Sequence, residues 1–278
     1  MIVVRDKAAL RAARAPLAGV GLVPTMGYLH EGHLSLVSRA RTECGQAAVS
    51  IFVNPTQFGP GEDLSRYPRD LERDLAVLER AGAALVFVPE AAEIYPPGFA
   101  TRIEVGPVAA PLEGAVRPGH FAGVATVVAK LINLVRPERV YFGQKDAQQC
   151  VVVRRMIRDL DLPVAMVVGE TVREPDGLAL SSRNAYLDPS QRARAPVLYR
   201  ALSAGRACYE SGERDAARLR AVMQGVLTEA GETAIDYVSV ADAETLLECA
   251  TVEGGALLSL AVRFGATRLI DNILLEAR

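Results

Sequence analysis

Two histidines three residues apart offer the first chemistry in this chain: His30 and His33 stand in the order His-x-Gly-His. On a helical turn, residues at this spacing face the same way. The first turn of a helix also carries unsatisfied N–H groups and a partial positive charge, which favour anions. Gly27 and Gly32 lack a Cβ, so the backbone there can approach a ligand closely. Because imidazoles can donate to phosphate oxygens whose charge changes during a reaction, we interpret residues 20–36 as a nucleotide site.

A metal site is the main alternative for the histidine pair, followed by two solvated histidines at a helix start. A zinc site normally has three or four protein ligands, and the only other histidine of the chain is His120. We therefore expect no protein-built metal site. Neither of the two common glycine-rich phosphate loops is present, so a nucleotide site must use other segments.

One such segment runs from Phe142 to Gln149 and has the pattern of a strand-to-helix turn. Its glycine, Gly143, permits close approach of a ligand, and Lys145 supplies a point charge for phosphate. Asp146 is placed to cap the following helix, and Gln149, one turn in, can present its amide to a cleft. Taken alone, this lysine and aspartate would more often be a solvated helix start.

A second segment, Leu180 to Asn184, combines two hydroxyls with one guanidinium. Arg183 has the planar fork that binds a polyphosphate with two parallel hydrogen bonds. Taken alone, this sequence predicts only a turn.

Alternating strand and helix signals position these segments. Apolar runs predict strands at 20–23, 47–53, 84–88, 101–105, 139–142 and 164–168, and helical spacing predicts helices at 34–41, 70–81, 122–135 and 146–160. Gly82 is expected to end the second of these helices. This alternation predicts a parallel sheet with helices on both faces, in which ligands bind at the carboxyl ends of the strands. Val23-Pro24, Val53-Asn54 and Phe142-Gly143 are expected at those ends.

The pattern changes beyond Glu174. Helices are predicted at 189–210 and 215–230, the second capped near Asp215, and strands at 235–240, 255–264 and 267–275. A run of helices followed by strands predicts a smaller α+β domain. The turn-forming sequence at 175–177 places the boundary, so we expect one domain at 1–175 and a second at 176–278.

Composition narrows the class of protein. The chain has 278 residues, half of them hydrophobic, with 31 basic and 33 acidic residues and no Trp. Balanced charge and few aromatics argue against nucleic-acid binding. The four cysteines lie far apart and suggest buried thiols in a reducing compartment. No signal peptide or bilayer-spanning apolar run is visible, so we expect a soluble, cytoplasmic protein that does not bind membranes.

The histidine pair resembles the HxGH signature of the nucleotidyltransferase superfamily, whose histidines hold the phosphates of ATP. Together with four further segments, it closely resembles the pantothenate synthetase (pantoate–β-alanine ligase) family, in the order of that family and across most of the chain, most weakly after about Leu198. The matching segments are Pro24–His33, Ser50–Phe58, Arg117–Phe121, Phe142–Asp146 and Leu180–Asn184.

The resemblance implies a Rossmann-like domain with a smaller C-terminal α+β lid, and a two-step reaction. The carboxylate of (R)-pantoate attacks the α-phosphorus of Mg-ATP, giving pantoyl adenylate and pyrophosphate. The amine of β-alanine then attacks the acyl carbon and releases AMP and pantothenate. An acyl adenylate is prone to hydrolysis, so a lid that excludes water protects it. The resemblance also suggests a homodimer.

The resemblance assigns roles to individual residues. His33 matches the catalytic acid of the family, with His30 beside it on phosphate. Lys145 and Arg183 would stabilise the charge of the leaving pyrophosphate. Gln57 and Gln149 would hold pantoate, and Gln57 would also lie near β-alanine. The ATP site would comprise Met26, Gly27, Tyr28, Leu29, His30, Glu31, Gly32, His33, Gly143, Gln144, Lys145, Asp146, Val172, Leu180, Ser181, Ser182 and Arg183.

One departure from the superfamily concerns the Lys-Met-Ser-Lys-Ser loop of many relatives. Here that loop has Arg183 and no lysine, so Lys145 is expected to carry the corresponding charge. No cluster of carboxylates predicts a protein-built Mg²⁺ site, and the ion is expected to be held by ATP phosphates and water.

Three other classes of protein share part of these features. A nucleotidyltransferase that keeps the nucleotidyl group on its product has the HxGH turn but does not account for Asn54–Phe58 or Arg117–Phe121. A non-catalytic nucleotide-binding protein would bind ATP without pantoate-dependent pyrophosphate exchange. A truncated tRNA synthetase would need an RNA-binding surface, which the charge balance does not offer.

Overall fold

The structure is a computed structural model that describes residues 1–276. Its larger part is a six-stranded sheet of order β1-β4-β3-β2-β5-β6, in which all neighbouring strands are parallel. The strands are β1 (Ile2–Val4), β2 (Val20–Thr25), β3 (Gln46–Ile51), β4 (Leu85–Phe87), β5 (Arg139–Gly143) and β6 (Ala165–Gly169). The predicted parallel sheet is confirmed.

Helices cover both faces of this sheet because successive strand residues point to opposite faces. Val20 and Leu22 of β2 pack in one core cluster with α1 (Lys7–Arg14), α6 (His120–Val135) and α7 (Ala147–Asp159). Val23 of the same strand packs in a second cluster, with α2 (Glu31–Cys44) and α3 (Leu71–Ala81). As predicted, α3 ends at Gly82, which adopts φ +75°. The site therefore rests on a sheet that is fixed from two sides.

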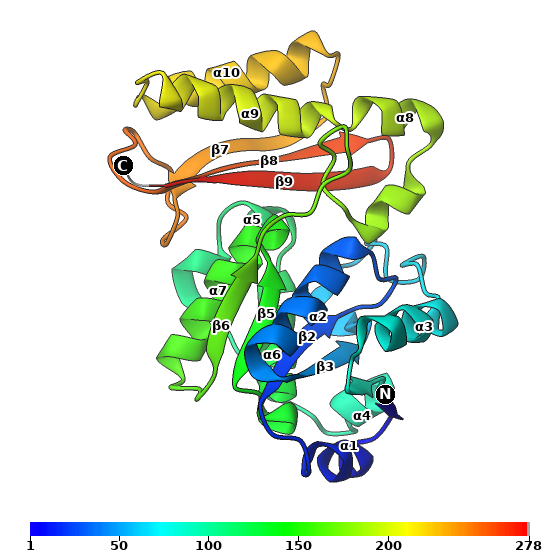
Figure 1. Cartoon of the computed structure of the whole chain (residues 1–278). Coiled ribbons are helices and arrows are strands. Elements are labelled where there is room, and N and C mark those ends of the chain that lie inside the picture. Colours follow the sequence, from blue (N-terminus) through cyan, green and yellow to red (C-terminus); the bar gives the residue numbers. More distant parts are fainter. Residues whose placement is uncertain (277–278) are drawn as a thin grey trace.

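The smaller part is an antiparallel sheet of order β7-β8-β9. Its strands are β7 (Ile235–Asp242), β8 (Ala256–Phe264) and β9 (Thr267–Leu275), and α9 (Val197–Glu210) and α10 (Ala216–Glu229) pack on one face in a third core cluster. Figure 1 shows this sheet lying across one end of the parallel sheet, with the two helices on its outer side. The predicted cap of α10 is confirmed, because Asp215 accepts from Ala217 N at 2.7 Å.

Two predicted elements are wrong. Residues 101–105 form no strand, because the N–H of Ile103 donates to Thr126 Oγ1 of α6 (3.0 Å) and not to a neighbouring strand. The helix predicted at 189–210 is two helices, α8 (Pro189–Arg194) and α9, separated at Pro196, which has no N–H to continue the hydrogen-bond ladder. Two elements, β1 and α1, were not predicted from the sequence; β1 is an edge strand of three residues, which gives almost no periodic signal.

The segment 170–188 connects β6 to α8 and contains the predicted turn, closed by a hydrogen bond from Gly177 N to Glu174 O of 2.9 Å. The domain boundary placed there stays a prediction. Shorter helical elements complete the fold: η1 (Pro55–Gln57), α4 (Ala91–Ile94), η2 (Gly106–Ala109), α5 (Glu113–Val116), η3 (Gln144–Asp146) and η4 (Ser182–Tyr186).

Two composition-based expectations can be compared with the fold. No helix within residues 1–276 is both long enough and apolar enough to cross a bilayer. All four cysteines are free, but only Cys44 and Cys150 are buried, whereas Cys208 and Cys249 are partly exposed. The expectation of buried thiols is therefore right for two of the four.

Candidate active site

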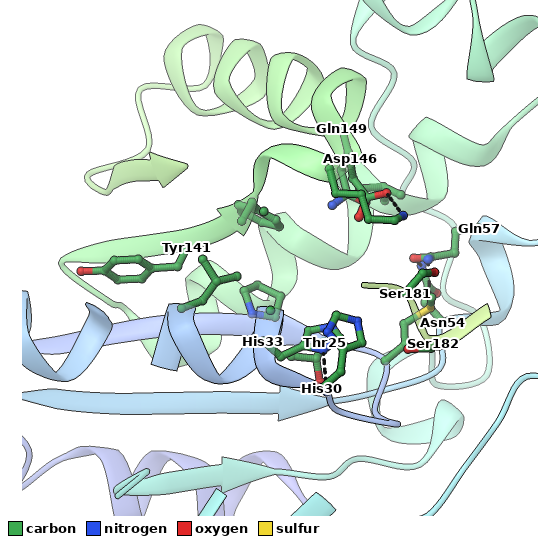
Figure 2. A pocket seen from close by; sticks show the side chains of 18 of the residues that line it. Thr25, His30, His33, Asn54, Gln57, Tyr141, Asp146, Gln149, Ser181 and Ser182 are labelled. Carbon is green, nitrogen blue, oxygen red and sulfur yellow. Dashed lines mark hydrogen bonds and ion pairs between the residues drawn. The ribbon is translucent and has the colours of Figure 1, made fainter. Parts of the chain in front are cut away.

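A cleft with a cavity of about 210 Å³ opens at the carboxyl ends of β2, β3 and β5. Residues from all three strand ends line it, as the predicted topology requires: Pro24 and Thr25, Phe52 and Asn54, and Phe142 and Gly143. Figure 2 shows the histidine pair on one side of this cleft and Asp146 and Gln149 of the β5–α7 region facing it from the other. The nucleotide turn and the Phe142–Gln149 segment are therefore brought together by the sheet.

The histidine pair lies at the start of α2, with His30 at the N-cap position and His33 in the first turn. Their ring centroids are 4.1 Å apart, which confirms that the two imidazoles face the same way. The backbone N–H of His30 donates to Nδ1 of His33 at 3.3 Å. Since Nδ1 accepts, the proton of a neutral His33 ring must sit on Nε2. The side chain is thus set up as an N–H donor.

Burial lowers the pKa of both histidines, to about 4 for His30 and to about 3 for His33. The second cause of the lowered pKa differs between the two residues. For His33 it is the neighbouring His30, and for His30 it is the charge of Lys145. Both rings are therefore neutral at pH 7 and act as hydrogen-bonding groups without a charge of their own. The positive charge of the site comes from other residues.

A carboxylate that the sequence analysis missed holds the turn that carries the histidines. Asp74 of α3 is buried and accepts from the backbone N–H of Tyr28 (2.7 Å) and of Leu29 (2.8 Å). Gly27 has φ +85°, and a Cβ there would lie 3.0 Å from the same carboxylate. The turn is therefore specific for glycine at this position and is fixed from an element distant in sequence.

Gln57 reaches the cleft from η1, a short helix packed against α6. The Asn54 side chain donates to Gln57 Oε1 and to Gly123 O, both at 3.1 Å, and Gln57 Nε2 lies 3.0 Å from the sulfur of Met26. A Cβ on Gly123 would come within 2.3 Å of Thr56 O, so the close packing of η1 on α6 requires this glycine. The Gln57 amide is thus oriented by a buried asparagine whose role the sequence analysis did not assign.

The backbone of Gln57 is held by a second chain of contacts. His120 Nδ1 donates to Gln57 O (2.8 Å), and His120 Nε2 accepts from Arg117 (3.1 Å), whose guanidinium also binds Glu62 (2.7 and 3.0 Å). Burial, followed by the charge of Arg117, lowers the pKa of His120 to about 4, so this ring is neutral at pH 7. The Arg117–Phe121 segment, which the sequence analysis matched without giving it a role, thereby supports Gln57.

The turn after β5 presents Lys145 and Asp146 to the cleft, with Lys145 Nζ 3.5 Å from Asp146 Oδ1. The prediction that Asp146 caps α7 is wrong, because its side chain accepts no cap hydrogen bond. The carboxylate instead faces the cations of the cleft: burial alone would raise its pKa, but Lys145 and Arg183 lower it below the ordinary value. Asp146 is therefore ionised beside the lysine. Gln149 lines the cleft, as predicted.

The hydroxyl segment reaches the histidine turn from the connection between the two sheets. Ser182 Oγ donates to Tyr28 O at 3.2 Å. Arg183 lines the cleft, but its guanidinium is bound by Asp63 through two hydrogen bonds of 2.9 Å. Asp63 lies in the glycine-rich loop after η1, and no pattern in the sequence indicates its role.

Most of the predicted site residues line the cleft, and five do not. The side chain of Leu29 is buried in the core, Glu31 is exposed, and Gln144 binds Asn272. Gly27 and Tyr28 form the turn without lining the cavity. The predicted residues that line it are Met26, His30, Gly32, His33, Gln57, Gly143, Lys145, Asp146, Gln149, Val172, Leu180, Ser181, Ser182 and Arg183. The role of each in binding ATP or pantoate stays a prediction.

The cleft has an apolar wall that the sequence analysis did not assign to the site. Helix α6 is buried on nearly all sides and contributes Val124, Val127, Val128 and Leu131. A helix that is hydrophobic on all sides is expected to be buried, but its sequence does not indicate which of its faces contacts a ligand. Tyr67, Glu170 and Thr171 also line the cleft, and no pattern in the sequence indicates this.

Within the described residues, no group of three or more His, Cys, Asp or Glu side chains is placed to hold a metal ion. Two carboxylates stand beside the proposed phosphate-binding residues: Asp146 next to Lys145, and Asp63 on Arg183.

A parallel sheet with paired imidazoles at the carboxyl ends of its strands defines a Rossmann-like α/β protein. The profile of the family described as Pantoate-beta-alanine ligase matches residues 2–274. The pantothenate synthetase of Roseiflexus sp. (strain RS-1) is 62% identical over 278 residues, and the match covers 100% of both chains. That of Chloroflexus aurantiacus (strain ATCC 29366 / DSM 635 / J-10-fl) is 62% identical, with 99% of each chain covered.

Solved structures agree with these sequence matches. The pantothenate synthetase from Thermus thermophilus superposes with a TM-score of 0.94 at 55% identity, covering 98% of this chain and 99% of that one. The pantoate-beta-alanine ligase from Francisella tularensis, solved with Beta-gamma ATP and β-alanine, gives 0.82 at 33% identity, covering 99% and 97%. The chain belongs to the pantoate–β-alanine ligase family.

Proposed function

We propose that this chain condenses (R)-pantoate with β-alanine to pantothenate, using ATP and releasing AMP and pyrophosphate through a pantoyl-adenylate intermediate. The observation that carries the proposal is the composition of one cleft: two neutral imidazoles, Lys145, Arg183 and the amides of Gln57 and Gln149 meet in a single cavity. Those groups match a triphosphate and a small hydroxy acid side by side. Family membership supports the same reaction.

In the first step, a pantoate carboxylate oxygen bonds to the α-phosphorus while the bond to the bridging oxygen of pyrophosphate breaks. Negative charge then develops on the leaving group. The Nε2–H of His33, the ammonium of Lys145 and the guanidinium of Arg183 are suited to stabilise it as it forms. His33 is neutral at pH 7, so it contributes a directed hydrogen bond and the two cations contribute the charge.

Pantoate is assigned to the region between η1 and α7. Gln57 and Gln149 can hydrogen-bond its hydroxyl and carboxylate groups without adding charge near the reacting carbon. The valines and leucine of α6 form an apolar wall for the two methyl groups of pantoate. Because Asn54 fixes the Gln57 amide, the orientation of the bound acid is set before it enters.

In the second step, the free amine of β-alanine attacks the acyl carbon, the C–N bond forms, and the bond to the AMP oxygen breaks. Water competes with the amine for the same carbon. We assign the C-terminal sheet with its helices the role of a lid that limits this competition. It lies across one end of the parallel sheet (Figure 1), and residues at the carboxyl ends of the strands line the cleft.

Three further expectations belong to the proposal. Mg²⁺ arrives with ATP and neutralises phosphate charge, with Asp146 as the nearest carboxylate of the turn. The protein works as a homodimer, as family resemblance suggests. The third is a cytoplasmic location, which suits the biosynthetic reaction proposed.

The deciding experiment measures exchange of labelled pyrophosphate into ATP, with and without pantoate. We expect exchange only when pantoate is present. When β-alanine is added, we expect release of one AMP for each pantothenate formed. Retention of the nucleotidyl group on the product would identify a nucleotidyltransferase instead. ATP binding without exchange would identify a non-catalytic nucleotide-binding protein.

A further inference from the structure

The side chain of Asn272 connects the C-terminal sheet to the nucleotide site. It lies on β9 and is 5% exposed. Its Nδ2 donates to the backbone carbonyls of Gln144 (3.0 Å) and Lys145 (2.8 Å), and its Oδ1 accepts from the Gln144 side chain (3.1 Å). Both amide hydrogens and the amide oxygen are thus used on the turn η3. That turn carries Lys145 and Asp146 into the cleft.

The preceding residue, Asp271, connects the same strand to a second cleft segment. Its carboxylate binds Arg173 through hydrogen bonds of 2.6 and 2.9 Å, and the Arg173 guanidinium stacks 4.0 Å from the ring of Tyr199 on α9. Arg173 follows Val172 and forms a β-bridge with Ala179, which precedes Leu180. The contact between Asp271 and Arg173 therefore holds the segment that contributes Val172 and Leu180 to the cleft. One dipeptide therefore holds two of the three proposed nucleotide segments.

Strand geometry explains how neighbouring residues do this. Consecutive side chains of a strand point to opposite faces. The core formed with α9 and α10 includes Leu269, Ile273 and Leu275 of β9, and Asp271 lies on the same face of the strand. On that face it binds Arg173, whose guanidinium stacks on the ring of Tyr199. Asn272 points the other way, toward the parallel-sheet part. A shift of β9 would consequently move the Lys145 turn and the Val172 segment together.

We propose that Asn272 is a positioning residue, which sets Lys145 for phosphate transfer and makes that setting depend on the C-terminal sheet. The inference rests on the proposed function, because it assumes that Lys145 acts on the phosphates of ATP. The position of Lys145 depends on the backbone that carries it. Asn272 donates its two amide hydrogens to the carbonyls of residues 144 and 145 and so holds this backbone in place. A displacement on the order of 1 Å can cost about 10²-fold in rate.

The sharpest variant is Asn272→Asp. It keeps the shape but places a carboxylate oxygen against two carbonyl oxygens, which reverses the interaction. Asn272→Ser serves as a second variant, with one donor left and no added charge. The matched control is Asn133→Asp, an exposed asparagine of α6 whose side chain donates to Ala129 O within its own helix.

The readout is pantoate-dependent ATP–pyrophosphate exchange, together with ATP affinity by calorimetry. We expect Asn272→Asp to lower the exchange rate by about 10²-fold and to weaken ATP binding, with the KM for pantoate changed less than about threefold. We expect Asn272→Ser to lie between this variant and the wild type, and Asn133→Asp to match the wild type.

A double-mutant cycle with Lys145→Ala separates positioning from mere structural support. If Asn272 acts through Lys145, then Asn272→Asp costs little further ATP affinity once the lysine is gone. Additive losses, or a rate for Asn272→Asp equal to that of Asn133→Asp, would overturn the inference. Failure of the proposed function would look different: the wild type itself would show no pantoate-dependent exchange, whereas the coupling in ATP affinity would still be measurable.

Discussion

The carboxylate of Asp63 binds the guanidinium of Arg183 through two hydrogen bonds of 2.9 Å, at the edge of the cleft. Burial alone would raise the pKa of Asp63, but the hydrogen bonds and charge of Arg183 outweigh it, and the pKa lies below the ordinary value. The neighbouring Glu62 binds Arg117 in the same way. Two consecutive acids thus hold two arginines of the cleft, and Asp63 occupies the fork that we assign to the triphosphate.

This pair predicts competition between Asp63 and ATP. We expect Asp63→Asn to bind ATP about three- to tenfold more tightly, because a charge-assisted contact worth about 1.5–3 kcal/mol no longer competes for Arg183, and part of this is offset by solvent. Calorimetric titration with ATP measures the effect. Glu72→Gln, an exposed acid of α3, is the control. Unchanged or weaker ATP binding in Asp63→Asn would show that the carboxylate does not compete with phosphate.

The geometry of His33 predicts which replacements retain activity. His33→Ala removes the Nε2–H donor, and we expect turnover to fall by about 10²–10³-fold, the scale for one transition-state donor. His33→Gln places an amide N–H near the same position and should recover part of the loss. Steady-state kinetics at saturating substrates, alongside thermal unfolding of each variant, measure this. Equal rates for the two variants would argue that the donor is not what His33 contributes.

Gln57 is expected to affect pantoate more than ATP. Removing its amide in Gln57→Ala should raise the KM for pantoate at least about tenfold, the factor equivalent to one hydrogen bond of about 1.4 kcal/mol. The KM for ATP should change less than about threefold, since the contact removed is with the acid. Because Asn54 orients this amide, Asn54→Ala should reproduce the same pattern more weakly. An unchanged dependence on pantoate in Gln57→Ala would remove this residue from the acid site.

The three histidines predict how stability depends on pH. Their pKa values in the fold are about 4, 3 and 4 for His30, His33 and His120, against an ordinary value of 6.5. The unfolded chain therefore binds more protons, so the free energy of unfolding rises with pH across this range. The stabilisation that depends on the neutral histidines is complete above about pH 6.5. It is lost as the pH falls toward about 4 for His30 and His120 and toward about 3 for His33.

Urea unfolding between about pH 5 and pH 7 tests this dependence. Each histidine should contribute up to about 1.4 kcal/mol per pH unit. His120→Asn keeps an N–H near the position of Nδ1, which bonds Gln57 O, but does not titrate. This variant should therefore lower the pH dependence of the free energy of unfolding by about the amount that one histidine contributes. A slope identical to that of the wild type would contradict the neutral, buried state of His120.

Asp74 is expected to act through the histidine turn. Asp74→Asn keeps the shape but can accept with only one of its two terminal atoms, so the N–H of Tyr28 or of Leu29 loses its partner. We expect a loss of about 1–3 kcal/mol in the free energy of unfolding, because a buried donor is left unpaired. ATP–pyrophosphate exchange should also fall. Denaturant unfolding and exchange assays measure the two effects, with Asp70→Asn, the cap of α3, as a stability control.

The sequence by itself determined the parallel sheet and the segments of the cleft. Apolar runs such as 47–52 and 140–142 are buried on both faces of the sheet, and a short continuous apolar run of this kind is typical of a strand in a parallel sheet. The His-x-Gly-His spacing fixed the two imidazoles on one side of a turn, because helical geometry is local. Family resemblance then predicted fourteen of the residues that line the cleft.

Only the tertiary structure decided which groups hold those residues in place. Asp74, Asp63 and Asn272 lie at least 45 residues from the turns or side chains they bind, and each looks like an ordinary polar residue in its own segment. The same holds for Ile103, whose predicted strand is absent because a threonine of α6 takes its N–H. Periodicity reports which face of an element is buried. It carries no information on which distant partner satisfies a hydrogen bond, because that depends on how the whole chain is packed.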